Sequence, residues 1–257
     1  QLSLELCRAI RSERGSQMVA LSGGVWQNRF LLERSILRLE KEGFRIKAVA
    51  GTSYGGLVAA FYALGYSPDE LEEIFASADQ TQYYGHAPQD GPSLVGLAGV
   101  TRLLEEKIGA RTFADLKLPC VLTAVDLKSG NEVLLRSGRL VDAILATIAM
   151  PGVFPARHID GLELVDGGTL DPVPVVPARM LAPRLPVVAV VLTMPMGGPA
   201  QSWNIPFNRY WAGMLISRLL SKMHYDTVWD VFSRSLDITA RAMTQYRLEM
   251  DRPDVII

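Results

Sequence analysis

The sequence has few of the residues from which metal centres, disulfide frameworks and histidine-based catalytic triads are built. Its 257 residues include two cysteines, Cys7 and Cys120, and three histidines, His86, His158 and His224. Two cysteines so far apart in the chain suggest neither a disulfide framework nor a cysteine-based metal site. Histidine is the usual base for a catalytic serine. Only His158, which precedes a turn, could join a triad, and no histidine stands in a persuasive motif.

An excess of one charge and a long apolar run are also missing. The chain has 26 Lys and Arg against 27 Asp and Glu, a formal net charge of −1, which gives no general field for attracting nucleic acid or an anionic membrane. The strongest apolar stretch, residues 185–196, contains two prolines and is far shorter than the ~20 residues of a spanning helix. Because 49% of the residues are hydrophobic, the composition is that of a packed globular protein.

These absences favour a cytoplasmic protein, at most peripheral at a membrane, that binds no nucleic acid. The chain begins at Gln1 without an initiator Met, so we expect a fragment or a processed product whose own address signal is not visible.

A strand, a glycine-rich turn and a helix follow one another twice near the amino terminus. The first copy occupies residues 18–43 and the second occupies residues 46–64. Strands that alternate with helices in short units argue for an α/β fold with a mainly parallel sheet covered on both faces. Downstream, Ser67 and Glu70 form a capping box at the start of a helix, and residues 80–99 favour a surface excursion. Further strands are expected at 119–125, 131–135, 162–165, 187–192 and 255–257, and further helices at 68–77, 140–149 and 228–249.

The second glycine-rich turn fits the pattern G-x-S-x-G. Gly51 and Gly55 lie two positions on either side of Ser53, where larger side chains would collide in a sharp strand-to-helix turn. Such a nucleophile elbow lifts the serine hydroxyl to the carboxyl end of the sheet, beside the positive end of the next helix. The alternative is an ordinary glycine-rich turn with a capping serine.

An aspartate is the second candidate for chemistry. Asp166 ends an expected strand before Gly167 and Gly168, so its carboxylate can face the carboxyl-end crevice where α/β sheets bind ligands. The alternative is that Asp166 only organises a turn. Asp126 is expected to structure a turn and Asp142 to be a surface charge.

Three segments together resemble the patatin-like phospholipases. They are residues 48–56, residues 148–155, and residues 165–168 followed by Pro-Val-Pro at 172–174. The resemblance implies a three-layer α/β/α fold and a Ser-Asp dyad that hydrolyses lipid acyl esters, with Ser53 as nucleophile and Asp166 as general base. It implies a lipid or phospholipid substrate and requires no metal and no organic cofactor. A free aspartate has a pKa near 3.9, so such a base needs a dry site within ~3 Å of the serine oxygen.

The amino-terminal turn departs from this pattern. Patatin-like proteins have three glycines there, whereas this chain has Gly23, Gly24 and Val25, followed by Arg29. Residues 1–44 instead resemble the carboxyl-terminal end of hydrogenase-maturation carbamoyltransferases. We expect one patatin-like domain over residues 1–257, with an atypical segment at 1–44 and a core at 45–257. The amides of Gly23, Gly24 and Val25 are the expected oxyanion hole.

Three functional hypotheses stay open. The first is a lipid acyl hydrolase, the second a nucleotide-binding carbamoyltransferase-related fragment, and the third a catalytically silent patatin-fold interaction module. Aromatic and basic residues alternate between Trp203 and Leu220, which suits either a surface that meets lipid or a helix packed on the core.

Overall fold

The computed structural model describes residues 18–24, 39–41, 43–76, 85, 87, 91–191, 193, 196–198, 200 and 225–257. Several expectations lie outside these residues. They concern Val25, Arg29, His86, His224 and residues 203–220.

The described strands form one mixed sheet in the order β5-β6-β3-β2-β1-β7-β8, with β4 paired to β3. Neighbours from β3 to β8 along this order are parallel, whereas β4 and β6 are antiparallel to β3 and β5 is antiparallel to β6. The expected α/β fold is therefore correct, with a parallel part and an antiparallel part. The strands are β1 (Met18–Gly24), β2 (Arg45–Thr52), β3 (Cys120–Asp126), β4 (Glu132–Leu135), β5 (Arg157–Ile159), β6 (Leu162–Asp166), β7 (Val187–Val191) and β8 (Val255–Ile256).

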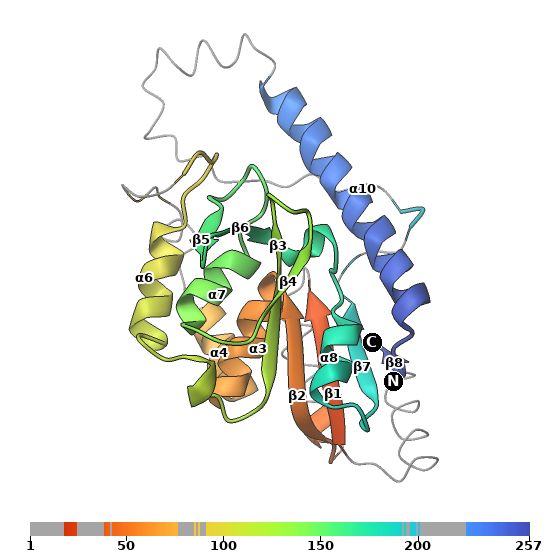
Figure 1. The fold of residues 1–257 in the computed structure, drawn as a ribbon. Coiled ribbons are helices and arrows are strands. Elements are labelled where there is room, and N and C mark those ends of the chain that lie inside the picture. Colours follow the sequence, from red (N-terminus) through yellow and green to blue (C-terminus); the bar gives the residue numbers. More distant parts are fainter. Residues whose placement is uncertain are drawn as a thin grey trace.

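Helices lie on both faces of the sheet, which gives three layers (Figure 1). One face is covered by α3 (Tyr54–Leu64), α4 (Pro68–Ala76), α6 (Ala98–Lys107) and α7 (Leu140–Thr147), and the other by α8 (Val175–Leu181) and the carboxyl-terminal part of α10 (Tyr225–Asp251). Two short 3₁₀ turns, η1 (Phe113–Asp115) and η2 (Gly167–Thr169), join these elements.

The strands supply alternate residues to two separate apolar cores. Along β7, Val188 and Val190 join the core beneath α3 and α7, whereas Val187 and Ala189 join the core beneath α8. Side chains alternate between the faces of a strand, so a strand buried on both faces has a continuous β-branched run. This is why residues 187–191 gave a clear strand signal.

Most of the expected elements are present, and three were missed. The capping box is confirmed, because Ser67 N–H donates to Glu70 Oε2 at 2.7 Å and Glu70 N–H donates to Ser67 Oγ at 3.3 Å. The sequence analysis did not predict α6, β5 or α8. The prolines at 172, 174 and 177 hide α8, because proline lacks the N–H that a helix interior needs.

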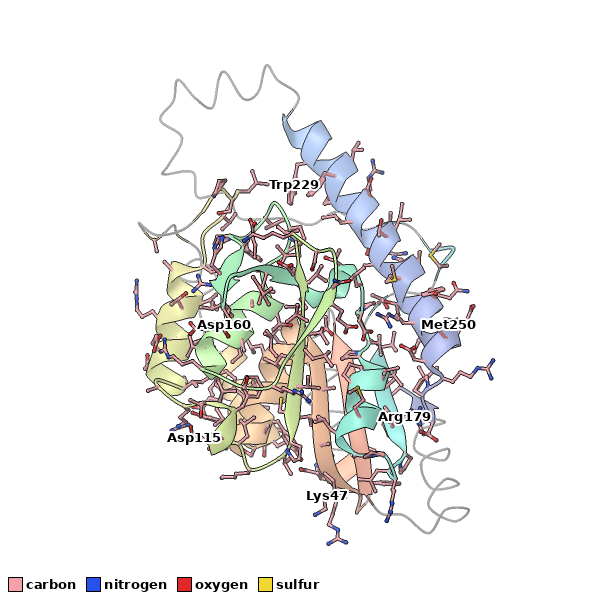
Figure 2. The ribbon with its side chains drawn as sticks, viewed as in Figure 1. Lys47, Asp115, Asp160, Arg179, Trp229 and Met250 are labelled. Carbon is pink, nitrogen blue, oxygen red and sulfur yellow. The ribbon has the colours of Figure 1, made fainter. Side chains whose placement is uncertain are left out.

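The residues that precede β8, near the carboxyl terminus, pack beside α8. Arg179 donates to the carbonyl of Arg252 at 2.9 Å and pairs with Asp254 at 3.3 Å. Figure 2 shows Arg179 near the end of α10 that contains Met250, far from Trp229 at the other end. These contacts anchor the residues between α10 and β8 to α8. Of the helices that the structure describes, none has the length and apolarity needed to cross a bilayer.

Candidate active site

Strand β3 brings the ends of two other strands together. Its residue Thr123 pairs with Thr52, the last residue of β2, and its next residue, Ala124, pairs with Asp166, the last residue of β6. Because β4 occupies the opposite edge of β3 over Leu122–Val125, β2 and β6 share one edge and meet end to end. The residue after Thr52 is Ser53, so the sheet register itself brings Ser53 and Asp166 together.

Ser53 lies in a sharp turn between β2 and α3. Its φ of 57° and ψ of −131° are rarely adopted by residues other than glycine. A Cβ atom on Gly51 would lie 2.5 Å from Gly56 Cα, and one on Gly56 would lie 2.9 Å from Thr147 Cγ2. Glycine at both positions therefore permits this turn, which we call the elbow. Gly55 is the buried second residue of α3.

The Ser53 hydroxyl points to a carboxylate. Ser53 Oγ donates a hydrogen bond of 2.6 Å to Asp166 Oδ2. The two residues are 3% and 5% exposed, so water has little access to this contact. A short hydrogen bond between a hydroxyl and a carboxylate aligns the proton for transfer.

Two further contacts hold Asp166 in place, one at its backbone and one at its carboxylate. Asp166 N–H donates to the carbonyl of Ala149 at 2.8 Å, and Gly168 N–H donates to Asp166 Oδ1 at 2.8 Å. A Cβ atom on Gly167 would lie 2.6 Å from the carbonyl oxygen of Thr123, so glycine lets the turn after Asp166 pack directly on β3. One carboxylate oxygen is thus held by the turn and the other is directed at Ser53.

Three threonines that the sequence analysis missed support the elbow. Ser53 N–H donates to Thr147 Oγ1 at 2.9 Å, and Thr147 Oγ1 donates to the carbonyl of Thr123 at 2.7 Å. Thr52 Oγ1 donates to the carbonyl of Asp171 at 2.8 Å, so the 2.6 Å contact between Thr52 and Thr123 hydroxyls takes its proton from Thr123. All three are fully buried. Only Thr52, beside the elbow, gave any sequence signal.

The end of β1 lies beside the elbow. Gly23 pairs with Gly51, and Gly24 pairs with Thr52. Strand β1 therefore ends one residue from Ser53 in the sheet register. Val25 itself is outside the described residues.

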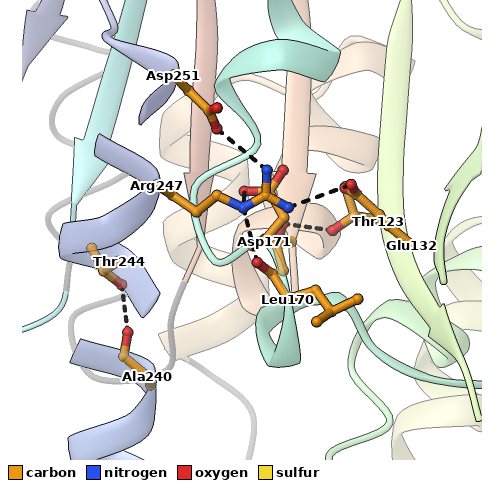
Figure 3. Close-up of polar contacts among 9 residues, drawn as sticks. Thr123, Glu132, Leu170, Asp171, Ala240, Thr244, Arg247 and Asp251 are labelled. Atoms are coloured by element: carbon orange, nitrogen blue, oxygen red, sulfur yellow. Dashed lines mark hydrogen bonds and ion pairs between the residues drawn. The ribbon is translucent and has the colours of Figure 1, made fainter. Parts of the chain in front are cut away.

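A charged cluster surrounds Asp171, just after η2 (Figure 3). Arg247 of α10 is 3.7 Å from Asp171, 3.6 Å from Glu132 and 3.5 Å from Asp251. Burial raises the pKa of the Asp171 carboxyl to about 7, although Arg247 opposes the shift. The sequence analysis identified none of these residues.

The other candidates lie elsewhere. His158 is exposed on β5, opposite Glu163. The hydroxyl of Ser53 donates to Asp166 and not to this histidine. Asp126 accepts from Ser129 N–H at 3.0 Å and Ser129 Oγ at 2.7 Å, so its expected role in a turn is confirmed. Asp142 is a half-buried residue of α7 that pairs with Arg139 at 3.7 Å.

Comparison with known proteins gives consistent similarities. A family model described as patatin-like phospholipase matches residues 18–179, more than half of the chain. An uncharacterized NTE family protein of Mycobacterium tuberculosis is 30% identical over 184 residues, a match that covers 70% of this chain and 50% of that protein. A protein of Vibrio cholerae named cGAMP-activated phospholipase is 29% identical over 167 residues, covering 54% of this chain and 47% of that protein.

The fold also has a counterpart among solved structures. The crystal structure of VipD from Legionella pneumophila matches with a TM-score of 0.52 at 12% identity, covering 72% of this chain and 51% of that one. This chain spans about half the length of the curated relatives that it matches. The family match begins at residue 18, so it includes β1 and starts before the expected core boundary at residue 45.

Proposed function

This chain belongs to the patatin-like phospholipase family, and we propose that it hydrolyses carboxylic ester bonds of lipids with Ser53 as nucleophile and Asp166 as general base. The observation that supports this most directly is the 2.6 Å hydrogen bond from Ser53 Oγ to Asp166 Oδ2 in a buried strand-to-helix turn. A serine hydroxyl is a weak nucleophile until a neighbouring base takes its proton. The Asp166 carboxylate is already within hydrogen-bonding distance of the Ser53 hydroxyl.

The reaction proceeds in two halves. Ser53 Oγ attacks the ester carbonyl carbon while its proton passes to Asp166; the ester C–O bond then breaks, and the alcohol leaves with that proton. The acyl group stays on Ser53. Asp166 next takes a proton from water, the resulting hydroxide attacks the acyl-enzyme, and the fatty acid leaves as the proton returns to Ser53 Oγ.

The negative oxygen of each tetrahedral intermediate needs hydrogen-bond donors. We assign this role to the backbone amides of Gly23, Gly24 and Val25, since the register brings the end of β1 beside the elbow. Ser53 also precedes α3, whose positive end favours negative charge at that position. Losing one oxyanion donor typically lowers kcat about 10²- to 10³-fold.

The substrate class follows from the family rather than from a bound ligand. A lipid or phospholipid ester fits both the family description and the name of the Vibrio cholerae relative. Contact with a membrane through residues 203–220 remains part of the proposal. The resemblance of residues 1–44 to carbamoyltransferases stays a prediction, and so does the nucleotide-binding hypothesis that rests on it.

Hydrolysis of p-nitrophenyl butyrate and of phosphatidylcholine vesicles tests the proposal. We expect Ser53→Ala to abolish both activities and Asp166→Asn to lower kcat about 10²- to 10⁴-fold. Matched controls are Ser235→Ala, which removes an exposed hydroxyl from α10, and Asp142→Asn on α7; both should keep the wild-type rate.

A fluorophosphonate probe separates an active site from a silent module. It should label the wild type and Ser235→Ala but not Ser53→Ala. Equal hydrolysis by the wild type and Ser53→Ala would refute the dyad, and absent labelling of the folded wild type would favour the interaction module.

A further inference from the structure

Helix α10 contributes a side chain to the turn that contains Asp166. The helix lies at residues 225–251, beyond the family match that ends at residue 179. Arg247, near its carboxyl-terminal end, extends from α10 to Leu170 and Asp171, just after η2 (Figure 3). An element outside the matched region therefore touches the segment that holds the proposed base.

A short series of hydrogen bonds connects the guanidinium to the carboxylate. Arg247 Nε–H donates to the carbonyl of Leu170 at 2.9 Å, and Leu170 N–H donates to the carbonyl of Gly167 at 3.0 Å. Gly168, the next residue, donates its N–H to Asp166 Oδ1 at 2.8 Å. Arg247 is thus bonded to the far end of the same 3₁₀ turn whose near end orients Asp166.

The same turn is also linked to the nucleophile. Asp171 N–H donates to the carbonyl of Gly167 at 2.8 Å, and the carbonyl of Asp171 accepts from Thr52 Oγ1, beside Ser53, at 2.8 Å. A shift of this turn would therefore change the position of both proposed reacting groups.

The contacts of Arg247 differ in what they can fix. Its ion pairs with Asp171, Glu132 and Asp251 are 3.5 to 3.7 Å long, whereas its bond to the Leu170 carbonyl is 2.9 Å. Coulombic attraction tolerates changes of distance and angle, but a hydrogen bond is directional. The ion pairs offset the charge of the three carboxylates, and the hydrogen bond to the Leu170 carbonyl fixes the position of the turn.

We propose that Arg247 is a positioning residue for the ester hydrolysis, which holds the Gly167–Asp171 turn through the Leu170 carbonyl and thereby aims Asp166 at Ser53. The proposal rests on the function proposed for that pair. Arg247 does not touch the reacting atoms, so its loss changes how well the base is aligned and leaves substrate binding intact. A misplacement of about 1 Å at such a group can lower a rate about 100-fold.

The test compares Arg247→Gln, Arg247→Lys and the control Arg234→Gln with the wild type and Ser53→Ala on p-nitrophenyl butyrate. Arg234 lies on the same helix in an exposed i,i+4 ion pair with Asp230. With rates normalised to the folded fraction from circular dichroism, we expect Arg247→Gln to lower kcat about 10- to 100-fold with KM within threefold. Arg247→Lys keeps the charge but not the Nε–H in its planar fork, so its kcat should also be low.

A double variant separates geometry from charge and covers a folding failure of Arg247→Gln. Asp171→Asn with Arg247→Gln removes the buried carboxylate together with its cation, so the variant is expected to fold and to keep the low kcat. Wild-type kcat in this double variant, or in Arg247→Lys, would mean that only charge balance matters and would overturn the proposal. So would equal losses in Arg247→Gln and Arg234→Gln.

The outcomes also distinguish a failure of the positioning role from a failure of the proposed ester hydrolysis. If Ser53→Ala is inactive while Arg247→Gln matches the wild type, the positioning role fails and the proposed function stands. If Ser53→Ala matches the wild type, the proposed function fails and the positioning role fails with it.

Discussion

Thr147 Oγ1 accepts the backbone N–H of Ser53 at 2.9 Å, in a fully buried position at the end of α7. Ser53, the donor of this bond, has a φ of 57°, which costs of order 1–3 kcal/mol for a residue other than glycine. The threonine also donates to the carbonyl of Thr123. One hydroxyl therefore satisfies two buried backbone groups and supports the strained elbow.

Replacing Thr147 with valine should destabilise the protein and lower activity. The variant keeps the side-chain shape but leaves Ser53 N–H and the Thr123 carbonyl without their partner, at about 1–3 kcal/mol each. We expect a loss of about 2–5 kcal/mol in the free energy of unfolding from urea titration. Thr147→Ser, which keeps the hydroxyl, should recover most of it. Thr101→Val, which removes a hydroxyl bonded within its own helix, should cost far less, and equal losses at 101 and 147 would contradict the role given to Thr147.

Alanine at Gly51 should strongly lower the rate of ester hydrolysis. The new Cβ would lie 2.5 Å from Gly56 Cα, and a backbone atom cannot move aside as a flexible side chain can. The elbow would have to open, with a loss of about 1–3 kcal/mol in stability and about 100-fold in kcat. Gly91→Ala is the matched control, since nothing lies within 4 Å of a Cβ at that position. Wild-type hydrolysis by Gly51→Ala would mean that the turn has more room than the structure gives it.

Features set by neighbouring residues could be predicted from the sequence. The elbow is one, because a strand, two flanking glycines and a helix lie within one stretch of chain. The turn after Asp166 is another, because Gly167 packs against β3 and Gly168 bonds to the carboxylate beside it. Where a turn requires glycine for steric reasons, that glycine can be recognised in the sequence beside the turn.

Features set by contacts between distant segments could not be predicted. Thr147 is 94 positions from Ser53, and Arg247 is 77 positions from Leu170. A single threonine on a helix, or one arginine on an amphipathic helix, has the same local pattern whether it faces solvent or a buried carbonyl. Their roles depend on which strands share an edge of β3, and that pairing is a property of the whole sheet.

Asp171→Asn should change how stability depends on pH. Burial raises the pKa of Asp171 from 3.8 to about 7, so between these values the folded state binds a proton that the unfolded state has released. The free energy of unfolding of the wild type should therefore fall as pH rises from 4 to 7. The asparagine variant lacks this proton, so its stability relative to the wild type should grow across the same window, by at most about 4 kcal/mol. A difference that stays constant from pH 4 to pH 8 would show that Asp171 titrates normally.

The stability of Asp126→Asn relative to the wild type should also depend on pH, but in the opposite direction from Asp171→Asn and at acid pH. Hydrogen bonds from Ser129 and from the backbone of Glu163 lower the pKa of Asp126 from 3.8 to about 2. The stabilisation is therefore complete above pH 4 and is lost as pH falls toward 2, because protonation removes the charged acceptor. In urea titrations, the wild type should be more stable than Asp126→Asn at pH 6, and this advantage should shrink between pH 4 and pH 2. Ser129→Ala removes the 2.7 Å hydroxyl donor and should reproduce part of the effect, whereas an advantage that persists unchanged at pH 2 would show that the carboxylate's charge is not what holds the β3–β4 turn.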